Sequence, residues 1–328
     1  MAKRGGGLTK AGEGLPALLG EMGVPPAADE AANDVQFLSK RLSNTLEAIT
    51  AVRTAREEGR QEIGFSSRPF ILCGLPVKRP AKGTLIHVRR NGKFFLRITG
   101  DPEFGLPFGQ DRLVPIWVAT LAIRQRSRVV HFDAAAEILE AFDLPRDGKT
   151  YRRLVEGFKR IFASTMFFGA EEELKTAAVW KGARFHFFDR MEIWYTKHVH
   201  QRNLPDDKFR NVIELSEAFW DELQAHPIPV DFAAVRALAD SPGALDFYMW
   251  LCWRCWKVRG VESIPLFGPG GLLGQLGVEG YGVRRNFRKT LRRWLIKTHA
   301  QWPECPAELS ADGDYLVIGH HKAIHTGV

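Results

Sequence analysis

Three things are scarce in this sequence: cysteine, long apolar runs and, over one segment, acidic residues. The chain has 328 residues but only 4 cysteines, too few for a disulfide framework, so we expect free thiols and a reducing compartment. No uninterrupted apolar run approaches the roughly 18 residues that a membrane-spanning helix requires. The basic start, Met1 to Arg4, resembles that of a signal peptide, but Glu13 and Pro16 interrupt the apolar stretch that follows. The sequence therefore predicts a soluble, cytoplasmic protein with no membrane contact.

The charge of the chain leans to the basic side. The 46 Lys and Arg exceed the 38 Asp and Glu, which gives a net charge of +8 and a pI near 9.4. Residues 1–34 are rich in Gly, Pro and Ala and carry more acids than bases, so the remainder is more basic than the whole. Residues 63–100 hold eight Lys and Arg and no acid. This balance favours nucleic acid or another anionic surface as the partner.

The segment 284–298 combines a helical apolar face with charge of one sign. One face of an amphipathic helix is formed by Phe287, Leu291, Trp294, Leu295 and Thr298, spaced i, i+4, i+7, i+8 and i+11. The other positions carry the cations Arg284, Arg285, Arg288, Lys289, Arg292, Arg293 and Lys297, and no acid occurs between Glu279 and Glu304. Acid–base pairs normally stabilise a surface helix. This helix is therefore either a solvated basic face or one that lies against a polyanion, such as the DNA major groove.

The order of the expected elements occurs twice along the chain. In the first half we expect a helix at 35–58, strands at 84–88 and 93–99 around the turn Asn91-Gly92, helices at 113–126, 133–142 (with Asp133 as N-cap) and 149–164, a strand at 129–132, and a long hairpin from 165–168 and 184–195. In the second half we expect strands at 212–215 and 263–266, helices at 217–224, 231–239, 244–257, 272–276 and 284–298, and a hairpin of 307–309 with 315–318. Helix, turn, basic helix and hairpin is the order of a winged helix-turn-helix.

Several separated segments carry a resemblance to a known family. They are Gly105-Leu106-Pro107-Phe108-Gly109 with Arg112-Leu113 and Thr120-Leu121-Ala122, Arg153 through Phe158 to Ser164, Val212 to Phe219, Pro227 to Asp231, Leu245 to Leu251 with Arg254, Ile264-Pro265, Gln275-Leu276-Gly277, Tyr281, and Asn286-Phe287-Arg288. In this order and spacing they resemble the plasmid-encoded RepA-type replication initiators over about residues 100–320. Leu266 stands where we expect Trp and Leu276 where we expect Phe, and Asp312 and Asp314 make the last hairpin acidic.

The fold class that we expect is mainly α with small β-sheets (α+β), as two tandem winged-helix domains. The expected division is a disordered tail at 1–34, a first domain at 35–195, a linker at 196–210 and a second domain at 211–328. The resemblance implies a plasmid replication initiator that binds repeated origin sequences (iterons) as double-stranded DNA, promotes origin opening and recruits the host initiator and replicative helicase. We expect no catalysis, no cofactor and no metal, and a homodimer remains open.

The predicted DNA contacts lie on the outer faces of the two basic helices. In the first helix they are Lys149, Arg152, Arg153 and Arg160, and in the second they are Arg284, Arg285, Arg288, Lys289, Arg292 and Arg293. Arginine paired with guanine is the commonest specific contact in the major groove. The sequence does not separate the residues that read bases from those that hold phosphate.

Two alternative functions and three weaker motifs stay open. A winged-helix transcriptional repressor would share the fold and the DNA without opening the duplex. A rolling-circle nickase would use His198 and His200 for a metal and a nucleophile from Tyr195, Tyr248 and Tyr281. The segment 143–150 nearly spells a P-loop but begins with Asp instead of Gly. The pair Cys252 and Cys255, with Cys305 and His299 downstream, lacks the spacing of a zinc finger and favours buried thiols. The three histidines near the C-terminus favour a polar tail.

Overall fold

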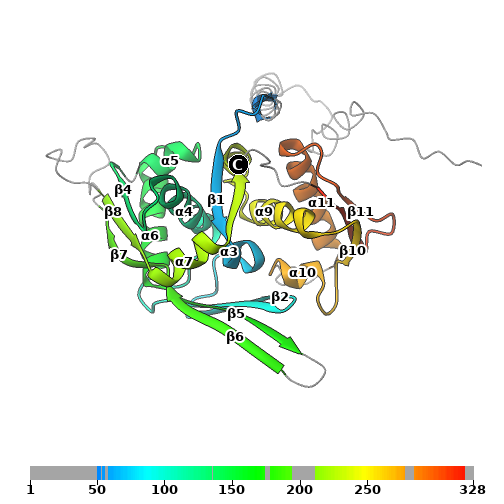
Figure 1. Cartoon of the computed structure of the whole chain (residues 1–328), viewed down its shortest axis with the longest axis horizontal. Coiled ribbons are helices and arrows are strands. Elements are labelled where there is room, and N and C mark those ends of the chain that lie inside the picture. Colours follow the sequence, from blue (N-terminus) through cyan, green and yellow to red (C-terminus); the bar gives the residue numbers. More distant parts are fainter. Residues whose placement is uncertain are drawn as a thin grey trace, which may run out of the picture. The chain divides into compact units, whose positions relative to one another are not determined.

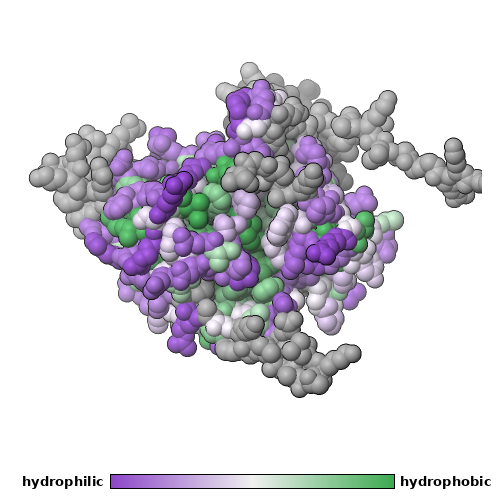
Figure 2. Space-filling view, viewed as in Figure 1, coloured by the Kyte–Doolittle hydropathy of each residue, from purple (hydrophilic) through white to green (hydrophobic). Residues whose placement is uncertain are grey.

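The computed structural model describes residues 50–52, 54–55, 58–134, 136–173, 178–193, 211–277 and 284–321. The contacts between residues group Val52–Val328 into one compact unit. The predicted tail at 1–34 and linker at 196–210 lie outside the described residues, as does most of the predicted helix at 35–58. Hydrophilic residues cover most of the face drawn in Figure 2, with small apolar patches between them.

Helices and short antiparallel strands alternate along the compact unit (Figure 1). The helices are α3 (Arg68–Cys73), the 3-10 helix η1 (Gly109–Arg112), α4 (Leu113–Gln125), α5 (Glu137–Ala141), α6 (Gly148–Ala163), α7 (Glu217–Ala225), α8 (Phe232–Ala237), α9 (Pro242–Lys257), α10 (Leu272–Gln275) and α11 (Arg284–Gln301). The strands are β1 (Ile63–Ser67), β2 (Ile86–Asn91), β3 (Phe94–Thr99), β4 (Val129–Phe132), β5 (Thr165–Glu173), β6 (Ala178–His186), β7 (Phe188–Glu192), β8 (Asn211–Leu215), β9 (Pro227–Asp231), β10 (Val261–Pro265), β11 (Ala307–Leu309) and β12 (Tyr315–Gly319).

The strands form four small sheets with the orders β1-β9, β4-β8-β7, β2-β3-β5-β6 and β10-β12-β11. All their pairings are antiparallel. The α+β class expected from the sequence is therefore confirmed. Strands from both predicted halves pair with each other, because β1 binds β9 and β8 inserts between β4 and β7.

Helix α9 runs through the core, and this explains its sequence. Tyr248 and Trp250 are fully buried although they lie on different sides of the helix. The helix contacts α3, β9, η1 and α11, so apolar residues are needed around most of its circumference. The Phe247 ring lies 6.3 Å from Trp250 and 6.0 Å from Trp294 of α11, measured between centroids. The basic helix α11 is thus fixed to a helix that runs through the core.

Most expected elements are present within a few residues of their predicted ends, but the helix at 133–142 is wrong at its start. The structure has α5 beginning at Glu137, and Asp133 is not its cap. Instead, Glu137 Oε1 accepts hydrogen bonds from the backbone N–H groups of Asp133 and Ala134, both at 2.8 Å. By accepting these two hydrogen bonds, the carboxylate stabilises a turn before the helix.

Candidate nucleic-acid interface

Helix α11 is amphipathic, as its sequence predicts. Phe287 and Leu291 are fully buried, and Trp294 is 6% exposed. A Cβ atom added at Gly243 of α9 would lie 2.3 Å from Trp294 Cζ2, so the absence of a side chain at Gly243 lets the indole pack directly against α9. On the other side, the Phe287 ring lies 5.9 Å from that of Phe267. The apolar face is therefore held from two directions and the basic face is turned to solvent.

Two of the predicted DNA contacts on α11 instead bind neighbouring parts of the protein. The Nε atom of Arg288 donates a hydrogen bond to Gly313 O at 2.9 Å, and its guanidinium forms an ion pair with Asp314. Arg284 and Arg288 also lie over the Phe267 ring, 5.1 and 5.2 Å from its centroid. This corrects the prediction that Arg288 contacts DNA, because its side chain instead holds the turn between β11 and β12.

The other four predicted DNA contacts of α11 form what we call the α11 cationic face: Arg285, Lys289, Arg292 and Arg293. All four are exposed. Their spacing of four, seven and eight residues places them along one side of the helix. Among the described side chains, none of the four is within salt-bridge distance of an acid, whereas Lys297 reaches Asp240 at 3.8 Å. Arg293 Nη2 also lies 3.4 Å from Thr290 Oγ1 of the same helix.

Helix α6 begins at a capped N-terminus. Asp147 Oδ1 accepts the backbone N–H of Thr150 at 2.7 Å, and this hydrogen bond is the main cause of the lowered pKa of Asp147. The segment that resembles a P-loop is thus a turn and a helix start whose cap is a carboxylate. Lys149, Arg152 and Arg153 follow in the first turns, and all three are exposed. We call these three cations the α6 cationic end.

Arg160 was predicted to contact DNA, and the structure places it inside the protein. Its Nε and Nη2 atoms donate to the two oxygens of Asp111 at 2.7 and 2.9 Å, and both side chains are nearly buried. The guanidinium also lies 4.9 Å from the centroid of the Phe108 ring. Arg160 therefore joins α6 to η1 and is removed from the candidate interface. Sequence reasoning missed this pairing because the two residues lie 49 positions apart.

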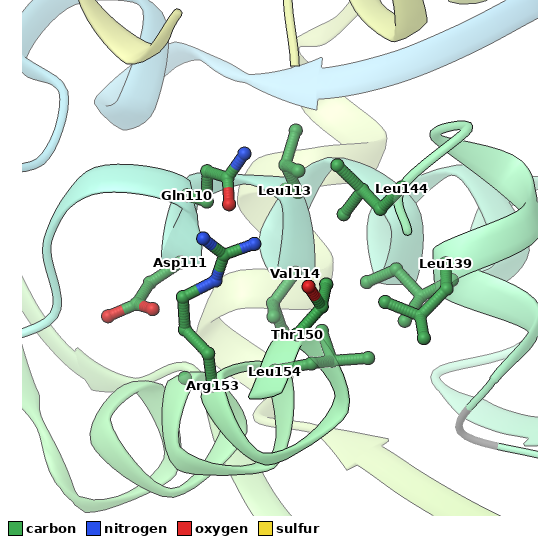
Figure 3. A pocket seen from close by; sticks show the side chains of 11 residues that line it. Gln110, Asp111, Leu113, Val114, Leu139, Leu144, Thr150, Arg153 and Leu154 are labelled. Atoms are coloured by element: carbon green, nitrogen blue, oxygen red, sulfur yellow. The ribbon is translucent and has the colours of Figure 1, made fainter. Parts of the chain in front are cut away.

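A hollow lies between η1, α4, α5 and the first half of α6 (Figure 3). Most of its lining is apolar, including Leu113, Leu139 and Leu144. Figure 3 shows Arg153 extending from α6 toward Gln110 at its mouth. The acid in its lining, Asp111, is already bound to Arg160. The hollow therefore presents no pair of groups arranged for acid–base chemistry.

The residues behind the nickase alternative are either buried or not described. Tyr248 is fully buried, so its hydroxyl has no access to a DNA strand. His198, His200, Tyr195 and Tyr281 lie outside the described residues, as do the C-terminal residues 322–328. The described part of the chain contains no group of three metal-ligating side chains.

The four cysteines are free thiols in buried positions, as the sequence indicated. A hydrogen bond to the Cys255 side chain, together with burial, raises the pKa of Cys305. Burial raises the pKa of Cys73 to about 12. The thiols of Cys73 and Cys305 therefore remain protonated at neutral pH, which is the unreactive form.

No described helix has both the length and the apolar composition needed to cross a membrane.

Residues 106–263 match the family model described as plasmid encoded RepA protein. The match includes α6 and ends before α11. Two solved structures of RctB are similar: a crystal structure of its domains 2-3 (TM-score 0.45, 12% identity, 75% of this chain and 95% of that chain) and one of selenomethionine derivatives of its domains 2 and 3 (TM-score 0.47, 12% identity, 75% and 94%). The search of curated proteins returned no match.

Proposed function

Residues 106–263 belong to the plasmid-encoded RepA family, and we propose that the chain is a replication initiator that binds repeated origin sequences as duplex DNA. The family match confirms the resemblance indicated by the sequence and supports a role in the initiation of plasmid replication. Binding to repeats, opening of the origin and recruitment of the host initiator and helicase are the finer parts of the proposal. Such a protein would act in the bacterial cytoplasm.

The α11 cationic face is the observation that carries the DNA-binding part of the proposal. It offers four exposed cations, none within salt-bridge distance of an acid among the described side chains, on a helix of 18 residues. At ~1.5 Å per residue the helix is about 27 Å long, which is enough to lie along the major groove. Like charges along one side destabilise a helix unless an anion neutralises them. The buried contacts of Phe287 and Trp294 hold the helix in place while this charge remains available.

We propose that each basic helix is the second helix of a winged helix-turn-helix. In the first, α6 follows α5 across a short turn and is followed by the long hairpin β5–β6. In the second, α11 follows α10 and is followed by the hairpin β11–β12. The tip of this second hairpin carries Asp312 and Asp314, so it would not bind phosphate. Arg288 stabilises that tip instead of reading bases.

The two helices would divide the contacts in different ways. Asp147 already occupies the amide of Thr150, so the start of α6 would bind phosphate mainly through the side chains of its cationic end. On α11, Arg285 and Arg292 lie two turns apart and would follow successive positions of one groove. Contacts to the DNA phosphate backbone fix the register of the protein on the duplex, and contacts to base edges give specificity.

This account includes no catalytic step. It is tested by incubating the protein with labelled single-stranded and supercoiled origin DNA in magnesium or manganese. A covalent protein–DNA adduct that is lost on changing Tyr195, Tyr248 or Tyr281 to Phe would contradict it and favour the nickase.

A repressor remains the second candidate, because it would share the duplex contacts but would protect a single palindrome instead of regularly spaced repeats.

The DNA-binding face is tested with a double variant, Arg285→Ala with Arg292→Ala, and a matched control, Arg190→Ala. Arg190 is also exposed, but it lies on β7 and pairs with Glu192 at 3.0 Å. Affinity for a duplex from beside the protein's own gene is measured at two salt concentrations. The double variant should bind at least ~10-fold more weakly, as expected for one or more lost base or phosphate contacts, and the control should bind like the wild type. Equal affinities for all three proteins would remove α11 from the interface.

A further inference from the structure

The sheet β2-β3-β5-β6 has one buried face and one open face. Leu96, Ile98 and Met166 are fully buried on the inner face, toward α3 and α10. Residues on the outer face alternate with them, as the pleat of a strand requires. Figure 1 shows the hairpin β5–β6 extending away from the helices. Much of the acid-free stretch 63–100 lies in β2, β3 and the loop before them, and the duplex contacts proposed above do not use it.

The strand register places the outer residues in three rows that cross the sheet. The central row is Val88, Arg97, Phe167 and Arg184. One flanking row is Arg90, Phe95, Gly169 and Gly182, and the other is Ile86, Thr99, Thr165 and His186. Directly opposed residues of an antiparallel pair share a face. In the central row, an aromatic ring thus stands between two arginines.

The aromatic residues of this face lie against the sheet. The rings of Phe95 and Phe167 are stacked, with centroids 5.5 Å apart and planes at 29°. The Arg90 guanidinium covers Phe95 at 5.4 Å from its centroid. A Cβ atom added at Gly182 would lie 2.4 Å from Phe167 Cζ, so the far end of the Phe167 ring rests over the backbone of β6. Phe167 keeps partial exposure, whereas Phe95 is 6% exposed.

The outer face also exposes aliphatic residues and cations together. Ile86 is 60% and Val88 49% exposed, and the two side chains lie two residues apart on the same face of β2. Arg97 and Arg184 are exposed, and neither has an acid within salt-bridge distance among the described side chains. The acid described on this face, Glu171, pairs with Arg90 at 3.1 Å. Lys78, Arg79 and Lys82 in the preceding loop are exposed as well.

We propose that this outer face, through Arg97, Phe167 and Arg184, binds single-stranded DNA. The inference rests on the proposed initiator function, because an opened origin supplies the single strand. Unpaired bases stack on aromatic rings and on aliphatic side chains, and arginines beside the ring bind the connecting phosphates. A duplex offers no exposed base faces, so the apolar part of the surface would be unused on it. The exposed guanidinium groups of Arg97 and Arg184 favour a nucleic acid over an apolar protein partner or a second copy of the chain.

The test uses the full-length protein and a fluorescein-labelled oligothymidylate of about 20 nucleotides, longer than the ~4–16 that one such site covers. Fluorescence anisotropy gives affinity over a range of salt. Arg97→Ala with Arg184→Ala should reduce the salt slope by about 1.4, or ~0.7 for each phosphate contact on a single strand. Phe167→Leu should weaken binding roughly 5- to 150-fold and Phe167→Tyr should not, because only the ring stacks on a base. Melting curves show which variants are folded.

The matched control is the double variant of α11, Arg285→Ala with Arg292→Ala, which should keep the oligothymidylate affinity and lose duplex affinity. If the wild type binds duplex but no oligothymidylate, or if the Arg97 and Arg184 variant binds the strand like the wild type, the inference is overturned. The inference is also overturned if the α11 double variant loses its affinity for the oligothymidylate. Should sedimentation show a dimer that the Arg97 and Arg184 variant dissociates, at unchanged strand affinity, the face belongs to a second copy. If the wild type binds the oligothymidylate but no duplex, the proposed function is refuted and the strand-binding inference is not.

Discussion

The guanidinium of Arg160 and the carboxylate of Asp111 form a bidentate ion pair, with Nε–Oδ2 at 2.7 Å and Nη2–Oδ1 at 2.9 Å. Asp111 Oδ2 also accepts the backbone N–H of Phe108 at 2.9 Å. A Cβ atom added at Gly157 would lie 2.7 Å from Asp111 Oδ1, so α6 approaches η1 closely at this point. The pair therefore sets the distance between the first basic helix and the element before α4.

The pair predicts a large stability effect and no direct effect on DNA. Asp111→Ala leaves a buried guanidinium without its carboxylate, which should cost ~3–5 kcal/mol of unfolding free energy. Arg152→Ala, an exposed change on the same helix, should leave stability within ~0.5 kcal/mol and weaken binding to duplex. Urea unfolding of both variants checks this. An unaltered midpoint for Asp111→Ala would show that the pair does not hold α6.

The cations of α11 should separate into two groups. Arg285→Ala and Lys289→Ala should keep the melting temperature and cost ~1–3 kcal/mol of binding if they read bases, with relaxed preference at one base pair. Loss of a phosphate contact should instead weaken all sequences alike and reduce the salt slope by about one. Arg288→Ala should destabilise the turn at Gly313 and Asp314, which a decrease in melting temperature would reveal. The grouping fails if Arg288→Ala melts like the wild type and affects DNA affinity alone.

The buried face of α11 should respond in the opposite way. Leu291 is fully buried, so Leu291→Ala should cost ~2–5 kcal/mol of stability through the cavity that it leaves. Binding should then decline only in proportion to the unfolded fraction, which parallel circular dichroism and affinity measurements would establish. Unchanged stability with lost DNA binding would mean that this face is not the core side of the helix.

His87 should make stability depend on pH. Burial, followed by the nearby charge of Arg89, lowers its pKa from 6.5 to about 4. As the pH falls, the unfolded chain therefore binds a proton at His87 at a higher pH than the folded chain does. The unfolding free energy is thus unaffected by His87 above pH ~6.5 and decreases as the pH falls toward 4. In His87→Gln, the unfolding free energy should fall less over this window than in the wild type. Parallel curves for the two proteins would exclude His87 as a source of the dependence.

The sequence predicted the elements that have a strong local pattern. The spacing of Phe287, Leu291 and Leu295 was sufficient for α11, and Asn91-Gly92 was sufficient for the β2–β3 hairpin. The pairing of β1 with β9 was missed because its partners lie up to 168 positions apart, as for Ile63 and Asp231, and because Pro227 and Pro229 argue against a strand except at an edge.

The candidate site was predicted only as far as helix periodicity allows. The helical period of 3.6 residues separates a buried side from a solvent-facing side, and it correctly predicted that Arg285 and Arg292 are exposed. It does not show which charged residue from another element approaches the helix. Arg160 and Arg288 were therefore assigned to DNA although Asp111 and Asp314 bind them. Such ion pairs are set by the tertiary fold.

The central claim is that the protein binds repeated duplex sequences at an origin, and a footprint on the DNA flanking its own gene tests it most directly. The account predicts protection of several direct repeats in one orientation, spaced by whole helical turns, with loss of protection in Arg285→Ala with Arg292→Ala. A single protected palindrome would contradict the initiator and favour a repressor. Uniform protection without repeats, unchanged in the variant, would contradict sequence-specific binding through α11.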